Sequence, residues 1–143
     1  MVGMEDQVAA AIDGLLDSMD PAALDDASLH ETVVALQGLT ARLAAARARV
    51  VSVWDARTVW AQDRSRSGPA RLARDARCAP ATARAEVRRA RKLRSMPRTR
   101  ESFEAGRLSV DHVEVLCAAN HVPVEALFAR DERLSRTSCE VVS

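Results

Sequence analysis

The sequence predicts an all-α protein, a helical bundle in which one long helix, residues 28–61, is followed by several short helices. Three observations predict this fold. Alanine and arginine are abundant, whereas the 143 residues include only five glycines and five prolines, a composition that favours helix over sheet. Apolar residues recur at helical spacing in most segments. Proline or serine stands where most of these segments begin, as is typical of helix starts.

The first element is an amphipathic helix over residues 5–19, ended by Asp20-Pro21 because proline disfavours a helical residue before it. Its apolar side consists of Val8, Ile12, Leu15, Leu16 and Met19. The first 41 residues contain eight acids and no basic residue. We expect residues 1–27 to form an acidic N-terminal helix and linker, and residues 28–143 to form a helical domain that is incomplete at its C-terminus.

The long helix opens at Ser28-Leu-His-Glu31, which has the pattern of a capping box. Its apolar residues repeat every seven positions in two interleaved series, which make a heptad seam. The seam consists of Leu36, Leu39, Leu43, Ala46, Val50, Val53 and Trp60. Such a seam packs along another helix, either within one chain or between two, so a homodimer stays open. Its contact residues would be Leu36, Leu39, Leu43, Val50 and Val53.

A polar loop then leads to a short helix, capped by Ser67 or Gly68 with Pro69 in its first turn. A basic helix of about fifteen residues follows, starting near Pro80 and ending before Pro97. The short helix, the tight turn and the basic helix have the layout of a helix-turn-helix. Helix pairs joined by proline also occur in bundles that bind no nucleic acid, and the turn lacks the usual glycine.

The basic helix has two faces when it is read at about 100° per residue. One face carries Ala83, Val87, Ala90 and Leu93, and the other carries Arg84, Arg88, Arg89, Arg91 and Lys92. Guanidinium groups match phosphate oxygens, so the functional interpretation is a nucleic-acid contact. The alternative is a solvated face in a protein with twenty arginines and one lysine. The candidate contacts are Arg71, Arg74, Arg77, Arg84, Arg88, Arg89, Arg91 and Lys92.

The nature of the nucleic acid follows from charge and composition. Eighteen basic and six acidic residues lie between Arg42 and Arg107, a local net charge of +12. Phosphate contacts give affinity without a choice of sequence. Only two Trp, two Phe and no Tyr are present, which argues against stacking on single strands. Duplex DNA is therefore the expected partner.

Three further segments complete the prediction. A short helix covers residues 98–105, and Gly106 stands where a left-handed C-cap belongs. Ser109 caps the next helix, with Leu108 and Val113 as a hydrophobic staple, and this helix ends near residue 120. A last helix is expected over residues 124–134.

Motifs of known enzymes are missing from the sequence. No GxxxxGK[ST], GxGxxG, HExxH or GxSxG pattern is present. Asp111-His112 and Asn120-His121 supply the letters of a His-Asn-His nuclease, but they fall around one predicted helix without the hairpin that such a metal site needs. We expect no catalytic residue, no metal and no cofactor in this chain.

The cysteines and the hydropathy pattern bear on location. Cys78, Cys117 and Cys139 are odd in number and lack metal-like spacing, which indicates three reduced thiols in a cytoplasmic protein. No run of eighteen uncharged apolar residues is present, so no membrane span is expected. The N-terminus lacks the pattern of a secretory signal.

Several of these segments together resemble one family. The matching residues are Trp60, Ser67-Gly68, Leu72-Ala73-Arg74, Ala83, Val87–Leu93, Met96–Thr99, Phe103–Ser109 and Asp111-His112-Val113. The most diagnostic piece is Pro97 followed by Gly106-Arg107-Leu108-Ser109-Val110-Asp111-His112. This pattern resembles the domain of unknown function 222, or 13E12 repeat family, of high-GC bacteria, over about residues 28–134.

The resemblance implies a helical region that commonly precedes a C-terminal His-Asn-His endonuclease module, and hence an accessory or DNA-engaging role beside that nuclease. The sequence departs from the family pattern in three respects, one of which is that the chain stops where the family's helical domain usually continues. No nuclease module is present, so a fragment and a natural short form are both open and nuclease activity is not expected of these residues. Ala70-Arg71-Leu72 also stands where the family usually has a tryptophan.

Overall fold

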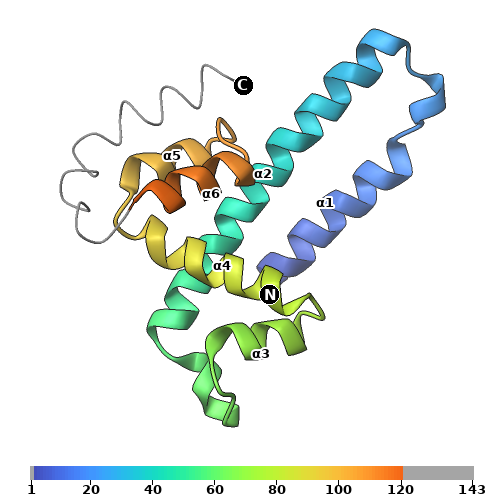
Figure 1. Cartoon of the computed structure of the whole chain (residues 1–143). Coiled ribbons are helices and arrows are strands. Elements are labelled where there is room, and N and C mark those ends of the chain that lie inside the picture. The colour runs from blue at the N-terminus through green and yellow to red at the C-terminus, as the bar shows by residue number, and fades with distance from the viewer. Residues whose placement is uncertain (1, 121–143) are drawn as a thin grey trace. The chain divides into compact units, whose positions relative to one another are not determined.

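The computed structural model describes residues 2–120 of the chain, and every regular element in that range is helical (Figure 1). The elements are α1 (Met4–Ser18), the 3-10 turn η1 (Pro21–Ala23), α2 (Asp26–Ala56), the 3-10 turn η2 (Val59–Asp63), α3 (Gly68–Asp75), α4 (Pro80–Leu93), α5 (Pro97–Glu104) and α6 (Val110–Ala119). The all-α prediction, with one long helix followed by short ones, is confirmed. The predicted helix over residues 124–134 lies outside the described residues.

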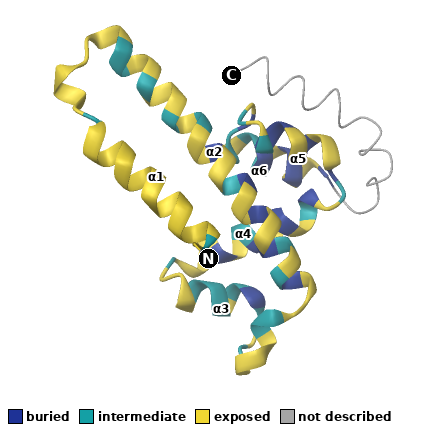
Figure 2. Ribbon diagram, turned by 180° about the vertical axis from the view of Figure 1, so that it is seen from behind, coloured by how far each residue is buried: buried dark blue, intermediate teal, exposed yellow. Residues whose placement is uncertain are grey.

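The chain divides into two compact units, Met1–Ala35 and Leu36–Ser143. We call their described parts the N-terminal unit, residues 2–35, and the bundle, residues 36–120. The N-terminal unit contains α1, η1 and the first turns of α2, and none of its described residues is buried (Figure 2). Asp20 caps the turn after α1, because its Oδ1 accepts a hydrogen bond from the Ala22 N–H at 3.2 Å.

The ends of α2 differ from the predicted ones. The Asp25 carboxylate accepts the Ser28 N–H at 2.7 Å, so Asp25 caps the helix and the predicted capping box at Ser28 is wrong. This hydrogen bond also lowers the pKa of Asp25. Helix α2 ends at Ala56 rather than at residue 61, because Thr58 has a left-handed backbone with φ of 50°. Trp60 consequently belongs to η2 and lies off the helix that carries the seam.

The core of the bundle lies where α4, α5 and α6 meet the inner side of α2, the dark blue region of Figure 2. The main cluster consists of Ala41, Ala45, Ala48, Leu93, Met96, Phe103, Leu108, Val113, Leu116 and Cys117. A second cluster joins Val51 of α2 to Val87 and Ala90 of α4, with Leu72 of α3 packed against it. Helix α2 therefore contributes alanine and valine side chains to the core.

The predicted seam of α2 lies on the opposite side from the core. Leu39, Leu43, Val50 and Val53 are 53%, 52%, 58% and 50% exposed. The expectation that this seam packs along another helix is therefore not met within the bundle. The physical reason is size, since the alanines of the inner face let α4 and α5 approach closely while leucines there would hold them apart.

The link between α5 and α6 follows the prediction closely. Gly106 has φ of +78°, and a Cβ at this position would lie 3.1 Å from the Gly38 carbonyl oxygen. Ser109 caps α6 by accepting the His112 N–H at 3.2 Å. Leu108 and Val113, the predicted staple, are both fully buried. This turn therefore fixes the position of α6 in the bundle.

Candidate nucleic-acid interface

Helices α3 and α4 form the pair that the sequence likened to a helix-turn-helix. Ser67 caps α3, its Oγ accepting the Ala70 N–H at 3.3 Å. The two helices pack through Leu72 on α3 and Val87 and Ala90 on α4. Arg77 occupies the turn between them with φ of 52°, the left-handed conformation that glycine usually supplies. The pair is thus well packed without a glycine in its turn.

Both candidate arginines of α3 are tied to neighbouring acids. The Arg71 guanidinium lies 3.5 Å from the Asp63 carboxylate and donates to the Val59 carbonyl oxygen at 2.7 Å. Arg74 donates to Asp63 and, at 2.7 Å, to Asp75. Hydrogen bonds from Ser65 and then from Arg74 hold the pKa of Asp63 well below its usual range. These contacts tie η2 to α3.

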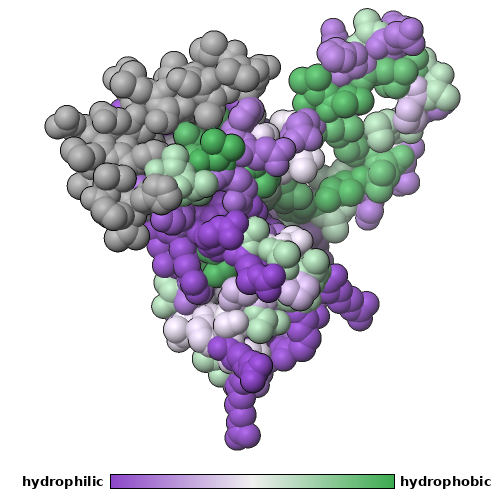
Figure 3. Space-filling model, in the orientation of Figure 1, coloured by the Kyte–Doolittle hydropathy of each residue, from purple (hydrophilic) through white to green (hydrophobic). Residues whose placement is uncertain are grey.

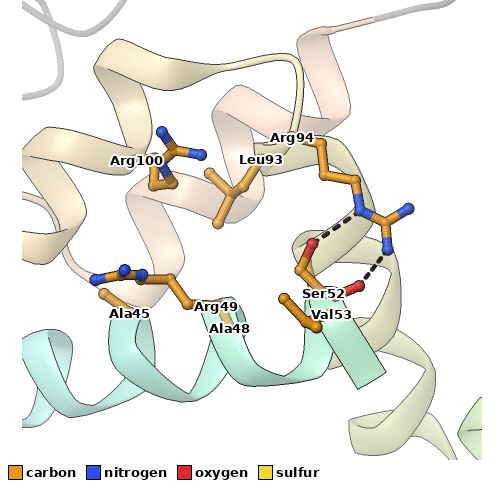
Figure 4. A pocket seen from close by; sticks show the side chains of 9 residues that line it. Ala45, Ala48, Arg49, Ser52, Val53, Leu93, Arg94 and Arg100 are labelled. Carbon is orange, nitrogen blue, oxygen red and sulfur yellow. Dashed lines mark hydrogen bonds between the residues drawn. The ribbon is translucent and has the colours of Figure 1, made fainter. Parts of the chain in front are cut away.

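Arg91 is clamped to α2. Its Nε and Nη2 each lie 2.8 Å from an oxygen of the Asp55 carboxylate, which is buried. The neighbouring Arg94 donates to Oγ and to the carbonyl oxygen of Ser52, at 2.8 Å and 2.6 Å (Figure 4). The Arg91 hydrogen bond is the main reason that the pKa of Asp55 is lowered. This cluster joins α4 to α2.

Arg89 corrects the predicted faces of α4. It is buried, and its Nη1 donates to Glu114 of α6 at 2.5 Å. Position 89 sits at the border of the apolar face of α4, on the side where α6 packs, so its guanidinium meets the Glu114 carboxylate of that helix. Arg88 donates to the second oxygen of Glu114 at 3.3 Å but stays 60% exposed.

Lys92 also has a partner inside the protein. Its Nζ donates at 2.7 Å to the carbonyl oxygen of Asn120, the residue that follows the last turn of α6. A cation at a helix C-terminus interacts favourably with the helix dipole, and here it also satisfies an otherwise unpaired carbonyl group. The single lysine of the sequence is therefore placed to hold the end of α6.

Two candidate residues, Arg77 and Arg84, are exposed and form no ion pair within residues 2–120. On α4, Arg84, Arg88 and Arg91 fall within an arc of roughly 60° at 100° per residue, and this row points away from the core. Hydrophilic side chains gather over this part of the bundle (Figure 3). The bundle holds eighteen basic and eight acidic side chains, so a positive excess of ten remains after pairing.

The His and Asn residues that could match a His-Asn-His nuclease site do not form such a site within residues 2–120. The His112 ring lies 3.2 Å from Ser109 Oγ in the cap of α6. Asn120 is buried and donates to Ser95 Oγ at 3.4 Å, while His121 lies outside the described residues. Among residues 2–120, no group of three His, Cys, Asp or Glu side chains is placed to hold a metal ion.

Sequence reasoning missed the acidic partners of the arginines. Asp55, Glu114 and Asp63 each bind two guanidinium groups, and the sequence pattern assigned none of these acids a role. The sequence did contain one signal for these pairs, because isolated acids in a strongly basic segment are natural partners for buried cations. Of the thiols, Cys78 and Cys117 are unpaired, and Cys139 lies outside the described residues. None of the described helices has the length and apolar character to cross a membrane.

Comparison with known proteins agrees with the resemblance seen in the sequence. Residues 30–140 match the family model described as domain of unknown function (DUF222), so the chain belongs to this family. Neither the curated proteins nor the solved structures contain a match to the chain.

Proposed function

We propose that this DUF222 protein is a non-catalytic, DNA-engaging helical domain that works beside a His-Asn-His nuclease module supplied by another segment or chain. The observation that carries the proposal is the row Arg84, Arg88 and Arg91 on the outer face of α4, within a bundle that has a positive excess of ten. Phosphate contacts of this kind bind duplex DNA regardless of its sequence. The unpaired thiols Cys78 and Cys117 support the cytoplasmic location that this role needs.

The ion pairs refine which candidate residues take part. Arg71, Arg74, Arg89 and Lys92 have structural partners, and we assign them to holding the bundle together. Arg77 and Arg84, which form no ion pair within residues 2–120, then carry most of the phosphate contact, together with Arg88, which stays 60% exposed although it donates to Glu114. Arg91 donates to Asp55 through two guanidinium nitrogens, but its side chain stays 52% exposed, so its remaining N–H groups can still donate to a phosphate.

The test is a titration of a labelled duplex with the full chain and with two matched variants. Arg84→Gln removes a charge from the row, and Arg57→Gln removes a charge that is also exposed but lies elsewhere on the bundle. We expect Arg84→Gln to weaken binding about tenfold and Arg57→Gln to weaken it no more than about twofold. Equal effects of the two variants would show general attraction to the basic domain and would remove the row from the proposal.

A second candidate function is self-association without a nucleic-acid contact. The specific observation in its favour is the exposed stripe of α2, in which Leu39, Leu43, Val50 and Val53 are each at least half exposed. These side chains share one face of α2, and a large contiguous apolar patch on a surface marks a protein contact. Sedimentation of the wild type against Leu43→Arg tests it. We expect a dimer that the substitution dissociates, and a monomer in both would contradict self-association.

A further inference from the structure

A hollow in the surface of the bundle lies beside the C-terminal end of the α4 row. It has a volume of about 160 Å³ and is lined by residues of α2, α4 and α5 and by Arg94, which follows α4. Its apolar lining includes Ala48 of α2 and Leu93 of α4, both members of the main core cluster. Figure 4 shows Arg94 on one side of Leu93, and Arg49 and Arg100 on the other. The hollow therefore combines an apolar floor with a rim of three guanidinium groups.

The carboxylate beside this rim holds two of the arginines only loosely. Arg49 and Arg100 both approach Oε1 of Glu104, at 3.7 Å and 3.9 Å. These distances lie beyond the range of a hydrogen bond, and the two side chains stay 69% and 46% exposed. Both guanidinium groups can therefore donate to a further anion.

Arg94 connects the hollow with the row on α4. It shares the Asp55 carboxylate with Arg91, the last member of the row. Its contacts with Ser52 and Asp55 use Nε and Nη2, so within residues 2–120 its Nη1 remains for a ligand.

The charges around the hollow do not cancel. Arg91 and Arg94 share one carboxylate, and the two loosely held arginines share another, so four cations face two anions. The positive excess of two favours an anionic occupant, and the apolar floor strengthens its attraction because it lowers the local dielectric constant.

A phosphate group fits the hollow in size and in chemistry. A volume of 160 Å³ is roughly five times the share of one water molecule in the liquid, which leaves room for one phosphorus atom and its four oxygens. The forked N–H groups of arginine match phosphate oxygens. Each strand of a duplex carries a phosphate for about every 3.4 Å of its axis, so a strand that lies along α4 brings further phosphates toward Arg94.

We propose that this hollow binds a phosphate group of the duplex that lies along the α4 row. The inference rests on the proposed function and extends the contact surface from α4 to α2 and α5. Arg49, Arg94 and Arg100 donate to the phosphate oxygens, whereas Glu104 competes with the phosphate for two of these arginines.

The first arm of the experiment removes the rim charges and titrates a labelled duplex. Arg49→Gln combined with Arg100→Gln should weaken binding at least about 30-fold and make the salt slope shallower by about 0.9, the share of one phosphate. The control is Arg57→Gln combined with Arg66→Gln, two exposed arginines that do not line the hollow. We expect it to weaken binding no more than about fourfold.

The second arm predicts a gain, which misfolding would not mimic. Glu104→Gln removes the competing carboxylate and frees both arginines, so we expect duplex binding to tighten by about three- to tenfold. The control is Glu101→Gln, which changes the net charge equally at an exposed position of the same helix that does not line the hollow. It should tighten binding no more than about twofold.

The two arms separate this inference from the function on which it rests. If the wild type binds the duplex and each variant behaves like its control, the hollow is overturned while the α4 row stands. If the wild type binds no duplex at low salt, both are overturned.

Discussion

The bundle and the N-terminal unit use the same kind of helix in opposite ways. The bundle surrounds fully buried side chains such as Phe103, Met96 and Leu108, and it links its helices through charge pairs. The N-terminal unit buries none of its described residues and carries eight acids without a basic residue. Helical periodicity therefore predicts a helix in both units, but it predicts a core only where several helices converge.

The same difference separates two uses of arginine. Arg89 and Arg91 bind Glu114 and Asp55 and so hold helices together, whereas Arg84 is exposed and forms no ion pair within residues 2–120. Within this dense run, some arginines therefore pair with acids and hold helices together, whereas others are exposed to solvent.

Truncating the core should destabilise the bundle most. Phe103→Ala removes a fully buried ring, and we expect it to lower the free energy of unfolding by about 3–5 kcal/mol. Leu16→Ala, in the exposed α1, should change it by no more than about 0.5 kcal/mol. Urea denaturation followed by circular dichroism measures both. Similar losses in the two variants would mean that the units do not differ in this way.

Breaking the charge cluster on α2 should come next. Asp55→Asn leaves Arg91 without its bidentate partner, and we expect a loss of about 2–3 kcal/mol at pH 7. Because the folded-state pKa of Asp55 is lowered, its stabilisation is complete above about pH 4 and disappears as the pH falls through that lowered value. Denaturation of both proteins from pH 7 to pH 2 tests this. The gap should narrow in acid, and a constant gap would contradict it.

Two glycines give opposite expected effects. Gly106→Ala adds a Cβ at φ of +78° and 3.1 Å from the Gly38 carbonyl oxygen, so we expect a loss of about 1–3 kcal/mol. Gly14→Ala adds a Cβ in open space inside α1, where it should increase helix content because glycine is a poor helix former. Thermal unfolding and helicity by circular dichroism report the two effects. A stabilised Gly106→Ala would contradict the tight approach of the α5–α6 turn to α2.

The thiols should differ in reactivity rather than in stability. Burial raises the pKa of the Cys117 thiol to about 11, with the Glu114 carboxylate adding to the rise. Cys78 is only half-buried. In a Cys139→Ser background, we expect iodoacetamide at pH 8 to label Cys78 in the native protein and Cys117 only after denaturation. Mass spectrometry of the labelled peptides identifies which cysteine has reacted. Prompt labelling of Cys117 in the native protein would contradict its burial.

Local signals carried most of what the sequence predicted correctly. Ser67, Ser109 and Gly106 act through hydrogen bonds and backbone angles set by their immediate neighbours, so each stands where the pattern placed it. Long-range pairing was missed, because nothing local tells that Glu114 reaches Arg89 across 25 positions. The heptad seam led to a wrong expectation for a related reason. Its leucines mark an apolar face of α2, but the other helices of the bundle pack on the opposite face, where alanines let them approach closely.

If the outward arginine row on α4 contacts phosphates, duplex binding must depend on salt in proportion to the number of those contacts. The logarithm of the association constant should fall linearly with the logarithm of salt concentration, with a slope of about −0.9 for each phosphate contact. For Arg84→Gln combined with Arg88→Gln, we expect that slope to become shallower by about 1.8. An equal slope in the wild type and the double variant, or no binding at low salt, would contradict the claim.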